Sequence, residues 1–179
     1  IEVDSTVFFQ IRSKSIDQST TIHQKTRLSP DFRLRSFSIL QEITGHRQQV
    51  EGKVEGNRLI YSIKSRGFDR EKSIEFSPET LPSATFILNL MAKGLKVGQK
   101  GTLPLFLEPF QMLVDREYEV LRRESLEYQG QLVETFVIKQ KFEGIETTLW
   151  VAEDASVIKE TTNQGFESLK ESAEVAPKL

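Results

Sequence analysis

The sequence contains no cysteine among its 179 residues. This absence excludes disulfides, thiolate metal sites and every mechanism that uses a cysteine nucleophile. No run approaches the roughly 20 apolar residues that a membrane-spanning helix needs, and the first residues lack the basic and then apolar pattern of a secretory signal peptide. The chain begins with Ile1 rather than Met, which predicts a processed chain or the excised N-terminal domain of a longer protein.

A strong charge of either sign is also absent. The chain has 26 acidic and 24 basic residues, so its charge balance selects no nucleic-acid partner. Arg33 with Arg35, and Arg122 with Arg123, are interspersed with acidic residues and share no face with stacking aromatics, so we interpret them as solvated strand faces. With 37% hydrophobic residues, the chain is typical of one globular β-rich domain, which we predict to span residues 1–179.

Turn-forming residues, by contrast, are frequent. Between them lie runs rich in Val, Ile, Phe, Tyr and Thr, several of which alternate with period two. Because short connections join antiparallel neighbours, we predict an antiparallel meander of about 10–11 strands. The predicted turns are Ser29–Asp31, Gly45–His46, Glu55–Asn57, Gly67–Asp69, 98–101, Gln129–Gly130, Glu143–Gly144, Glu153–Ser156 and Asn163–Gly165.

The alternation fails in two of the predicted strands. Phe32 and Leu34 share one parity, while Phe37 has the other, so either a β-bulge lies near Ser36 or both faces of this strand are partly covered. The run LVETFVIKQKF shows the same ambiguity. A single strongly curved sheet, half-barrel or barrel-like, with apolar concave and convex surfaces would explain both, and we predict this architecture.

One segment breaks the β pattern. Pro82 suits a first helical turn, and Gly94 stands where a helix would end. We predict one helix near residues 83–93, which is too short to be stable alone in water and must pack on the sheet. Its apolar face at helical spacing consists of Phe86, Ile87, Leu90 and Met91.

The segment 147–172 contains the only tryptophan and two adjacent carboxylates, Glu153 and Asp154. In the predicted strand before the carboxylates, Trp150 faces one way and Leu149 the other. Adjacent positions of a strand point to opposite faces, so neighbouring carboxylates are poorly placed to converge on one substrate atom. We therefore interpret them as solvated residues of a hairpin turn rather than as an active site.

Other candidate chemistry is equally sparse. His23 alternates with Lys25 and Arg27 in a predicted exposed strand, and His46 lies beside a glycine turn. A zinc site would need a third ligand, and the sequence has no GxSxG or SxxK nucleophile motif and no glycine-rich phosphate loop. We predict no catalytic residue, no cofactor and no metal site.

The remaining candidates are apolar. These side chains either fill the core beneath the helix or line a cavity that a large curved sheet leaves open, since side chains fill only the smaller barrels. A hydrophobic ligand would enter such a cavity near the helix. The candidate cavity residues are Phe86, Leu90, Met91, Phe106, Phe110 and Trp150.

Four segments taken in order, LSPDFRLRSFSI, QVEGKVEGNRLIYSI, ILNLMAKGLKVGQKGTLPLFLEPF and TTLWVAEDASVIKETTNQGFESLKES, resemble the β-rich region N-terminal to the catalytic core in bacterial transglutaminase-like proteins. The resemblance runs from Val7 to Val175. It rests on the DFxLRSF strand, the LKxGQ turn before a proline-containing strand, and the Trp-Val-x-x-Asp hairpin. More distantly, the chain is similar to envelope β domains of unknown function and to the half-barrel carriers of periplasmic lipoproteins.

The resemblance implies a barrel-like antiparallel sheet with a helix packed on it. The transglutaminase-like core would supply Cys, His and Asp, and this chain has no Cys. The leading hypothesis is therefore a non-catalytic accessory domain of a bacterial periplasmic or envelope protein, which positions a following transglutaminase-like domain of the same polypeptide or binds its substrate. The alternative is a free-standing carrier or sensor of a lipid or other hydrophobic ligand. A third reading, an enzyme in its own right, needs polar side chains that converge in a cleft.

Overall fold

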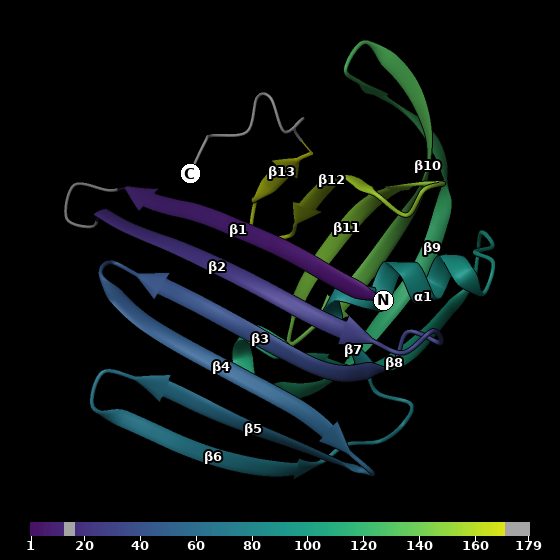
Figure 1. The fold of residues 1–179 in the computed structure, drawn as a ribbon. Coiled ribbons are helices and arrows are strands. Elements are labelled where there is room, and N and C mark those ends of the chain that lie inside the picture. Colours follow the sequence, from purple (N-terminus) through teal and green to yellow (C-terminus); the bar gives the residue numbers. More distant parts are fainter. Residues whose placement is uncertain (13–16, 171–179) are drawn as a thin grey trace. The chain divides into compact units, whose positions relative to one another are not determined.

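The computed structural model describes residues 1–12 and 17–170 and shows a mainly β protein (Figure 1). These residues form thirteen strands, one α-helix and two 3-10 helices, and the strands make two sheets. The first sheet has the order β1-β2-β3-β4-β5-β6. Its strands are β1 (Glu2–Arg12), β2 (Asp17–Leu28), β3 (Leu34–Ile43), β4 (His46–Glu55), β5 (Arg58–Ser65) and β6 (Phe68–Glu75).

The first sheet is the predicted antiparallel meander. Its pairs follow the order of the chain, and two-residue turns join the strands from β3 to β6. At the turn between β3 and β4, Thr44 and Gly45 both have positive φ, 43° and 81°. Two consecutive residues with positive φ match the twist of a tight hairpin, which is why a glycine stands there.

The predicted irregularity near Ser36 is a β-bulge. Ser36 pairs with Arg27 and Leu34 pairs with Leu28, so Arg35 has no opposite residue on β2. The extra residue reverses the parity of the strand and allows both Leu34 and Phe37 to be buried.

The second sheet has the order β13-β12-β11-β10-β9-β8-β7. A second register irregularity lies between β9 and β10, where Val137 pairs with Arg122 and Ile138 with Val120, so Leu121 is the extra residue. Its strands are β7 (Leu81–Pro82), β8 (Lys100–Leu107), β9 (Met112–Tyr128), β10 (Gln131–Phe142), β11 (Ile145–Ala152), β12 (Val157–Thr162) and β13 (Glu167–Leu169).

The helical segment lies between β7 and β8 and matches the predicted position. A 3-10 turn, η1 (Ser83–Thr85), leads into α1 (Phe86–Ala92), and Gly94 follows with a φ of 76°. The buried residues of α1 are Phe86, Asn89 and Leu90, so the buried face includes a polar residue that the apolar pattern did not predict. Among the described residues, no helix is long and apolar enough to cross a membrane.

The chain divides into two compact units that are interleaved in sequence. The first consists of residues 1–85 and 105–113, and the second of residues 86–104 and 114 onward. The core of the first unit surrounds Phe106, whose ring centroid lies 5.5 Å from that of Phe37 and 5.8 Å from that of Phe76. Because all three rings are at most 4% exposed, each contributes on the order of 2 kcal/mol through burial.

Three parts of the predicted architecture need correction. The strands form two sheets instead of one, and neither is closed, since β1, β6, β7 and β13 are edges in the described residues. The pair β7–β8 is parallel, because the connection through α1 is long enough for a crossover. There are thirteen strands instead of about 10–11, and β7, with two residues, is too short to leave a periodic pattern in the sequence.

Candidate functional site

The six predicted cavity residues lie in different surroundings. On α1, Phe86 and Leu90 are buried and Met91 is half-buried. Phe106 is at the centre of the first unit's core. Phe110 ends the 3-10 helix η2 (Glu108–Phe110) and is 68% exposed.

Trp150 lies on β11 and faces away from α1. Tyr118, Gln140 and Thr147 are directly opposite one another on β9, β10 and β11, so they share one face of the sheet. Phe86 packs edge-on against Tyr118, with ring centroids 6.2 Å apart, and therefore covers this face. Trp150 has the other parity and faces the opposite side.

The surroundings of Trp150 are polar and charged. Its indole Nε1 donates a hydrogen bond to Glu124 Oε1 at 3.3 Å, and Lys159 Nζ lies 5.4 Å from its ring centroid. The structure thus does not bring Trp150 together with Phe86. A cavity lined by the six residues stays a prediction, and none of the pockets described below includes one of them.

The remaining sequence candidates occupy the predicted local positions. Glu153 and Asp154 form the turn between β11 and β12, where Asp154 Oδ1 accepts a hydrogen bond from the Ser156 backbone N–H at 2.9 Å. His23 is exposed on β2, and His46 begins β4. In residues 1–12 and 17–170, no group of three His, Cys, Asp or Glu side chains is placed to hold a metal ion.

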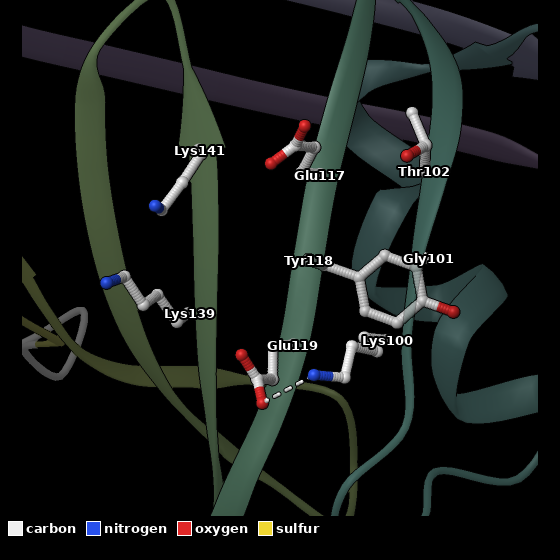
Figure 2. Close-up of a pocket in the computed structure, with 8 residues that line it drawn as sticks. All are labelled: Lys100, Gly101, Thr102, Glu117, Tyr118, Glu119, Lys139 and Lys141. Atoms are coloured by element: carbon white, nitrogen blue, oxygen red, sulfur yellow. Dashed lines mark ion pairs between the residues drawn. The ribbon is translucent and has the colours of Figure 1, made fainter.

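One pocket of the second unit is a groove of about 340 Å³ along β8, β9 and β10 (Figure 2). Tyr118 extends from β9 toward Gly101, and a side chain at Gly101 would begin 3.3 Å from the tyrosine ring. The groove is lined by Lys100, Gly101, Thr102, Glu117, Tyr118, Glu119, Lys139 and Lys141.

Four of the five charged side chains of this groove form ion pairs. Lys100 Nζ lies 3.5 Å from Glu119 Oε1, as the dashed line in Figure 2 shows. Lys139 and Lys141 both form ion pairs with Glu146 on the adjacent strand β11. Paired and solvated side chains of this kind are typical of an exposed sheet face. Glu117 is the charged residue of the lining that takes part in no ion pair of the described residues.

A second pocket of this unit, of about 200 Å³, has a different character. It opens on the face of the sheet that carries Tyr118 and takes side chains from four consecutive strands, β9 to β12. We call it the Arg116 pocket, and it is lined by Arg116, Gln140, Lys141, Phe142, Ile145, Thr147 and Glu160.

The Arg116 guanidinium is fixed but incompletely bonded. One terminal nitrogen, Nη1, donates a hydrogen bond to Gln140 Oε1 at 3.2 Å. The carbon of the guanidinium lies 5.9 Å from the ring centroids of both Phe86 and Phe142. Its Nε is buried and has no hydrogen-bond partner in the described part of the chain. Burial lowers the pKa of Arg116, although a guanidinium remains protonated at neutral pH.

Glu160 is the acidic group of this pocket. It lies directly opposite Leu149 and is half-buried. Burial raises the pKa of Glu160, and the charge of Arg116 opposes this rise only in part. Among the described residues, no ion pair within 4.0 Å joins Glu160 to Arg116. The pocket therefore holds a desolvated cation and a carboxyl group that do not neutralise each other by direct contact.

The sequence reasoning missed these residues although a signal was present. Arg116 stands between Val114 and Tyr118 in an alternating strand, and Gln140 stands between Ile138 and Phe142. A polar residue at an inward position of such a pattern is the informative exception.

The first unit contains another buried acid, Glu108. Its side chain is 0% exposed. Its Oε2 accepts hydrogen bonds from the Ser83 backbone N–H at 3.2 Å and from Ser83 Oγ at 2.5 Å. Burial raises the pKa of Glu108 despite these bonds. The carboxylate satisfies the first N–H group of η1 and holds η1 to η2, which is a structural role.

Comparisons of this chain with known proteins give information about its fold alone. No family model matches the chain, and no curated protein matches it. A β-barrel-like protein of the domain of unknown function DUF1849 from Brucella abortus is similar, with a TM-score of 0.69 and 10% identity over 93% of this chain and 77% of the other. A DUF1089 family protein from Pseudomonas aeruginosa has a TM-score of 0.52 and 14% identity over 94% of this chain and 91% of the other. Neither of these two similar structures is described as a transglutaminase-like protein.

Proposed function

We propose that this chain is a non-catalytic binding domain and that the Arg116 pocket holds a polar group of its ligand. The observation that carries the proposal is the buried, unpartnered Nε of Arg116 beside an open pocket. A buried donor without a partner costs about 1–3 kcal/mol. Such groups in folded proteins are normally satisfied by protein, water or ligand, and a ligand group that accepts a hydrogen bond would remove this cost.

The polar lining favours this proposal over a carrier of purely apolar molecules. Gln140 and Thr147 are at most 9% exposed and face the pocket beside Arg116. Burying such groups against an apolar ligand would leave them unpaired. An apolar carrier remains the alternative. The β-barrel-like protein with a TM-score of 0.69 is the structural neighbour that supports this alternative.

The wider role is also a proposal. The ordered motifs that resemble transglutaminase-like proteins support an accessory domain that positions a following catalytic domain or binds its substrate in the bacterial periplasm or envelope. Sequencing the parent gene beyond Leu179 tests this part separately. A downstream domain with Cys, His and Asp would support it, and an immediate stop codon would refute it.

The binding role can be tested through the Arg116 side chain itself. We expect its Nε–H signal in a nitrogen–proton correlation spectrum to shift when small polar probes are added, including carboxylates, amides and sugars. Arg116→Gln should abolish the accompanying shifts of the backbone signals of β9 to β12, because it removes the donor. Arg122→Gln is the matched control, since Arg122 lies on the same strand with its guanidinium paired to Glu124 outside the pocket. If no probe of any class shifts the Arg116 signal, the binding proposal is wrong.

A further inference from the structure

We infer that the group bound in the Arg116 pocket is a carboxylate attached to a small apolar body. This inference rests on the proposed function and names the chemical class of the ligand. It follows from four properties of the pocket: the unpartnered edge of the guanidinium, the apolar part of the lining, the low net charge and the small volume.

The free edge of Arg116 suits a planar oxyanion. Gln140 binds Nη1, whereas Nε has no partner in the described residues and is itself buried, so a ligand oxygen reaches Nε only when the side chains around it move. In a guanidinium, Nε and the terminal nitrogen on the other side from Nη1 form an edge with two parallel N–H groups. A carboxylate presents two oxygens at matching separation, and such bidentate pairs are stronger than single hydrogen bonds between neutral groups.

Part of the pocket's lining is apolar. Phe86 and Phe142 flank the guanidinium at 5.9 Å each, and Ile145 lines the pocket while being 37% exposed. Ile145 pairs directly with Phe142 across β10 and β11. A ligand that reaches Arg116 with its carboxylate can therefore contact Phe142 and Ile145 with its remaining atoms, which favours an acid with an apolar body over a small inorganic ion.

The charges of the pocket argue against a phosphate. Lys141 is the second cation of the lining, but its Nζ lies 2.7 Å from Glu146 Oε1. Glu160 adds a carboxyl group to the wall. One unpaired guanidinium beside an acid can compensate a single negative charge better than the charge of about −1.5 to −2 on a phosphate monoester.

The size of the pocket sets a further limit. Its volume of about 200 Å³ lies below the roughly 300–1,000 Å³ that is usual for sites of drug-sized ligands. It can accept one functional group and a short side chain. The end of a short acyl chain and the C-terminus of a peptide both carry this chemistry, and the experiment below separates these two sources.

Glu160 would then tune the affinity. In its charged form it repels a ligand carboxylate, and in its protonated form it can donate a hydrogen bond to it. Glu160→Gln removes the negative charge and keeps a hydrogen-bond donor. We expect this variant to bind a carboxylate at least about three-fold more tightly at pH 7.5.

The test is a titration of the 179-residue chain with benzoate, benzamide, acetate and phosphate, followed through the Arg116 Nε–H signal and the backbone signals of β9 to β12. Benzoate should bind at least about ten-fold more tightly than each of the others, because only benzoate combines a single planar anion with an apolar body. Hexanoate and N-acetylphenylalanine then compare an acyl chain with a peptide C-terminus, and tighter binding of either identifies the source.

The outcomes separate the inference from the proposed function. Equal binding of benzamide or phosphate would overturn the carboxylate inference while leaving a binding pocket. The carboxylate inference would also be overturned if sugars shift the Arg116 signal and benzoate does not. Arg116→Lys keeps the charge and loses the two-donor edge, so it should weaken benzoate by at least about ten-fold and provides a second variant if Arg116→Gln fails to fold. Unchanged benzoate affinity in Arg116→Lys would also overturn the inference.

Discussion

Glu108 in the first unit and Glu160 in the second are both carboxyl groups whose pKa is raised mainly by burial, yet their surroundings differ. Glu108 is fully enclosed and accepts two hydrogen bonds from Ser83. Glu160 is half-buried, lines an open pocket and has no side-chain hydrogen bond to the described residues. A raised pKa alone therefore does not distinguish a structural acid from a functional one. The presence of an accessible space and an unpartnered cation does.

The same contrast holds for the side chains around the two acids. In the first unit, Glu108 lies near a core in which Phe106 packs against other aromatic rings. In the second unit, Arg116 lies between aromatic rings but keeps a free Nε. We expect substitutions in the first unit to change stability and substitutions in the Arg116 pocket to change binding.

The largest effect should come from replacing Glu108. Glu108→Ala leaves the N–H and hydroxyl of Ser83 without their acceptor, and we expect the free energy of unfolding to fall by about 3 kcal/mol. Glu108→Gln keeps an acceptor of the same shape and should cost less than about 1 kcal/mol. Glu160→Ala should cost less than about 1 kcal/mol, because its side chain forms no hydrogen bond with the residues that the structure describes. Urea unfolding followed by circular dichroism measures all three, and equal losses for Glu108→Ala and Glu160→Ala would remove the distinction between the two acids.

A smaller effect should separate the two units by their packing around glycine. The ring of Phe37 covers Gly52, and a Cβ added there would lie 2.6 Å from Phe37 Cζ. Phe37 is 4% exposed and packs against Phe106, so its ring cannot move freely. We expect Gly52→Ala to destabilise the protein by about 2 kcal/mol through overpacking.

Gly101→Ala in the second unit is the matched comparison. The added Cβ would lie 3.3 Å from the Tyr118 hydroxyl and ring edge, which is the far end of a half-buried side chain. A shift of a few tenths of an ångström relieves this contact, so we expect a cost below about 1 kcal/mol. Thermal unfolding measures both variants, and a larger loss for Gly101→Ala would show that the second unit is the more rigidly packed around its glycine.

The sequence predicted features that local residues determine. The parity change between Leu34 and Phe37 indicated a bulge near Ser36, and the structure has one at Arg35. The turn residues placed the hairpins after β11 and β12, and Gly94 marked the end of the helical segment. Each of these depends on side-chain parity or backbone freedom within a few residues.

Features that depend on distant partners were missed. The sequence showed that Trp150 and Leu149 face opposite ways, but it could not show that α1 covers the face of Leu149, because that depends on packing between Phe86 and Tyr118. The Arg116 pocket likewise needs the register of four strands to bring Arg116, Gln140 and Glu160 together. Strand register and the division into two sheets are set by contacts far apart in sequence, which periodicity alone does not encode.

The pH dependence of stability offers the finest comparison of the two acids. Because the pKa of Glu108 in the folded state lies above its ordinary value of 4.5, the folded protein binds this proton more tightly than the unfolded chain. The resulting stabilisation is fully present below the unfolded pKa and is lost as the pH rises through the folded pKa, with about 1.4 kcal/mol for each unit between them. The raised pKa of Glu160 changes stability with pH in the same direction, but the change is smaller because Glu160 is partly exposed.

Glu124 and Glu146 are half-buried and paired with basic side chains, which lower their pKa values. They therefore change stability in the opposite direction, below their ordinary pKa of 4.5. The informative quantity is therefore the difference in unfolding free energy between the wild type and each variant from pH 4 to pH 8. As the pH rises, the unfolding free energy of the wild type should fall relative to that of Glu108→Gln. It should also fall relative to that of Glu160→Gln, but by a smaller amount. The opposite outcome is a steeper pH dependence of the unfolding free-energy difference between the wild type and Glu160→Gln than between the wild type and Glu108→Gln. Glu160 would then be the more strongly desolvated acid, and the Arg116 pocket would be less open than its lining indicates.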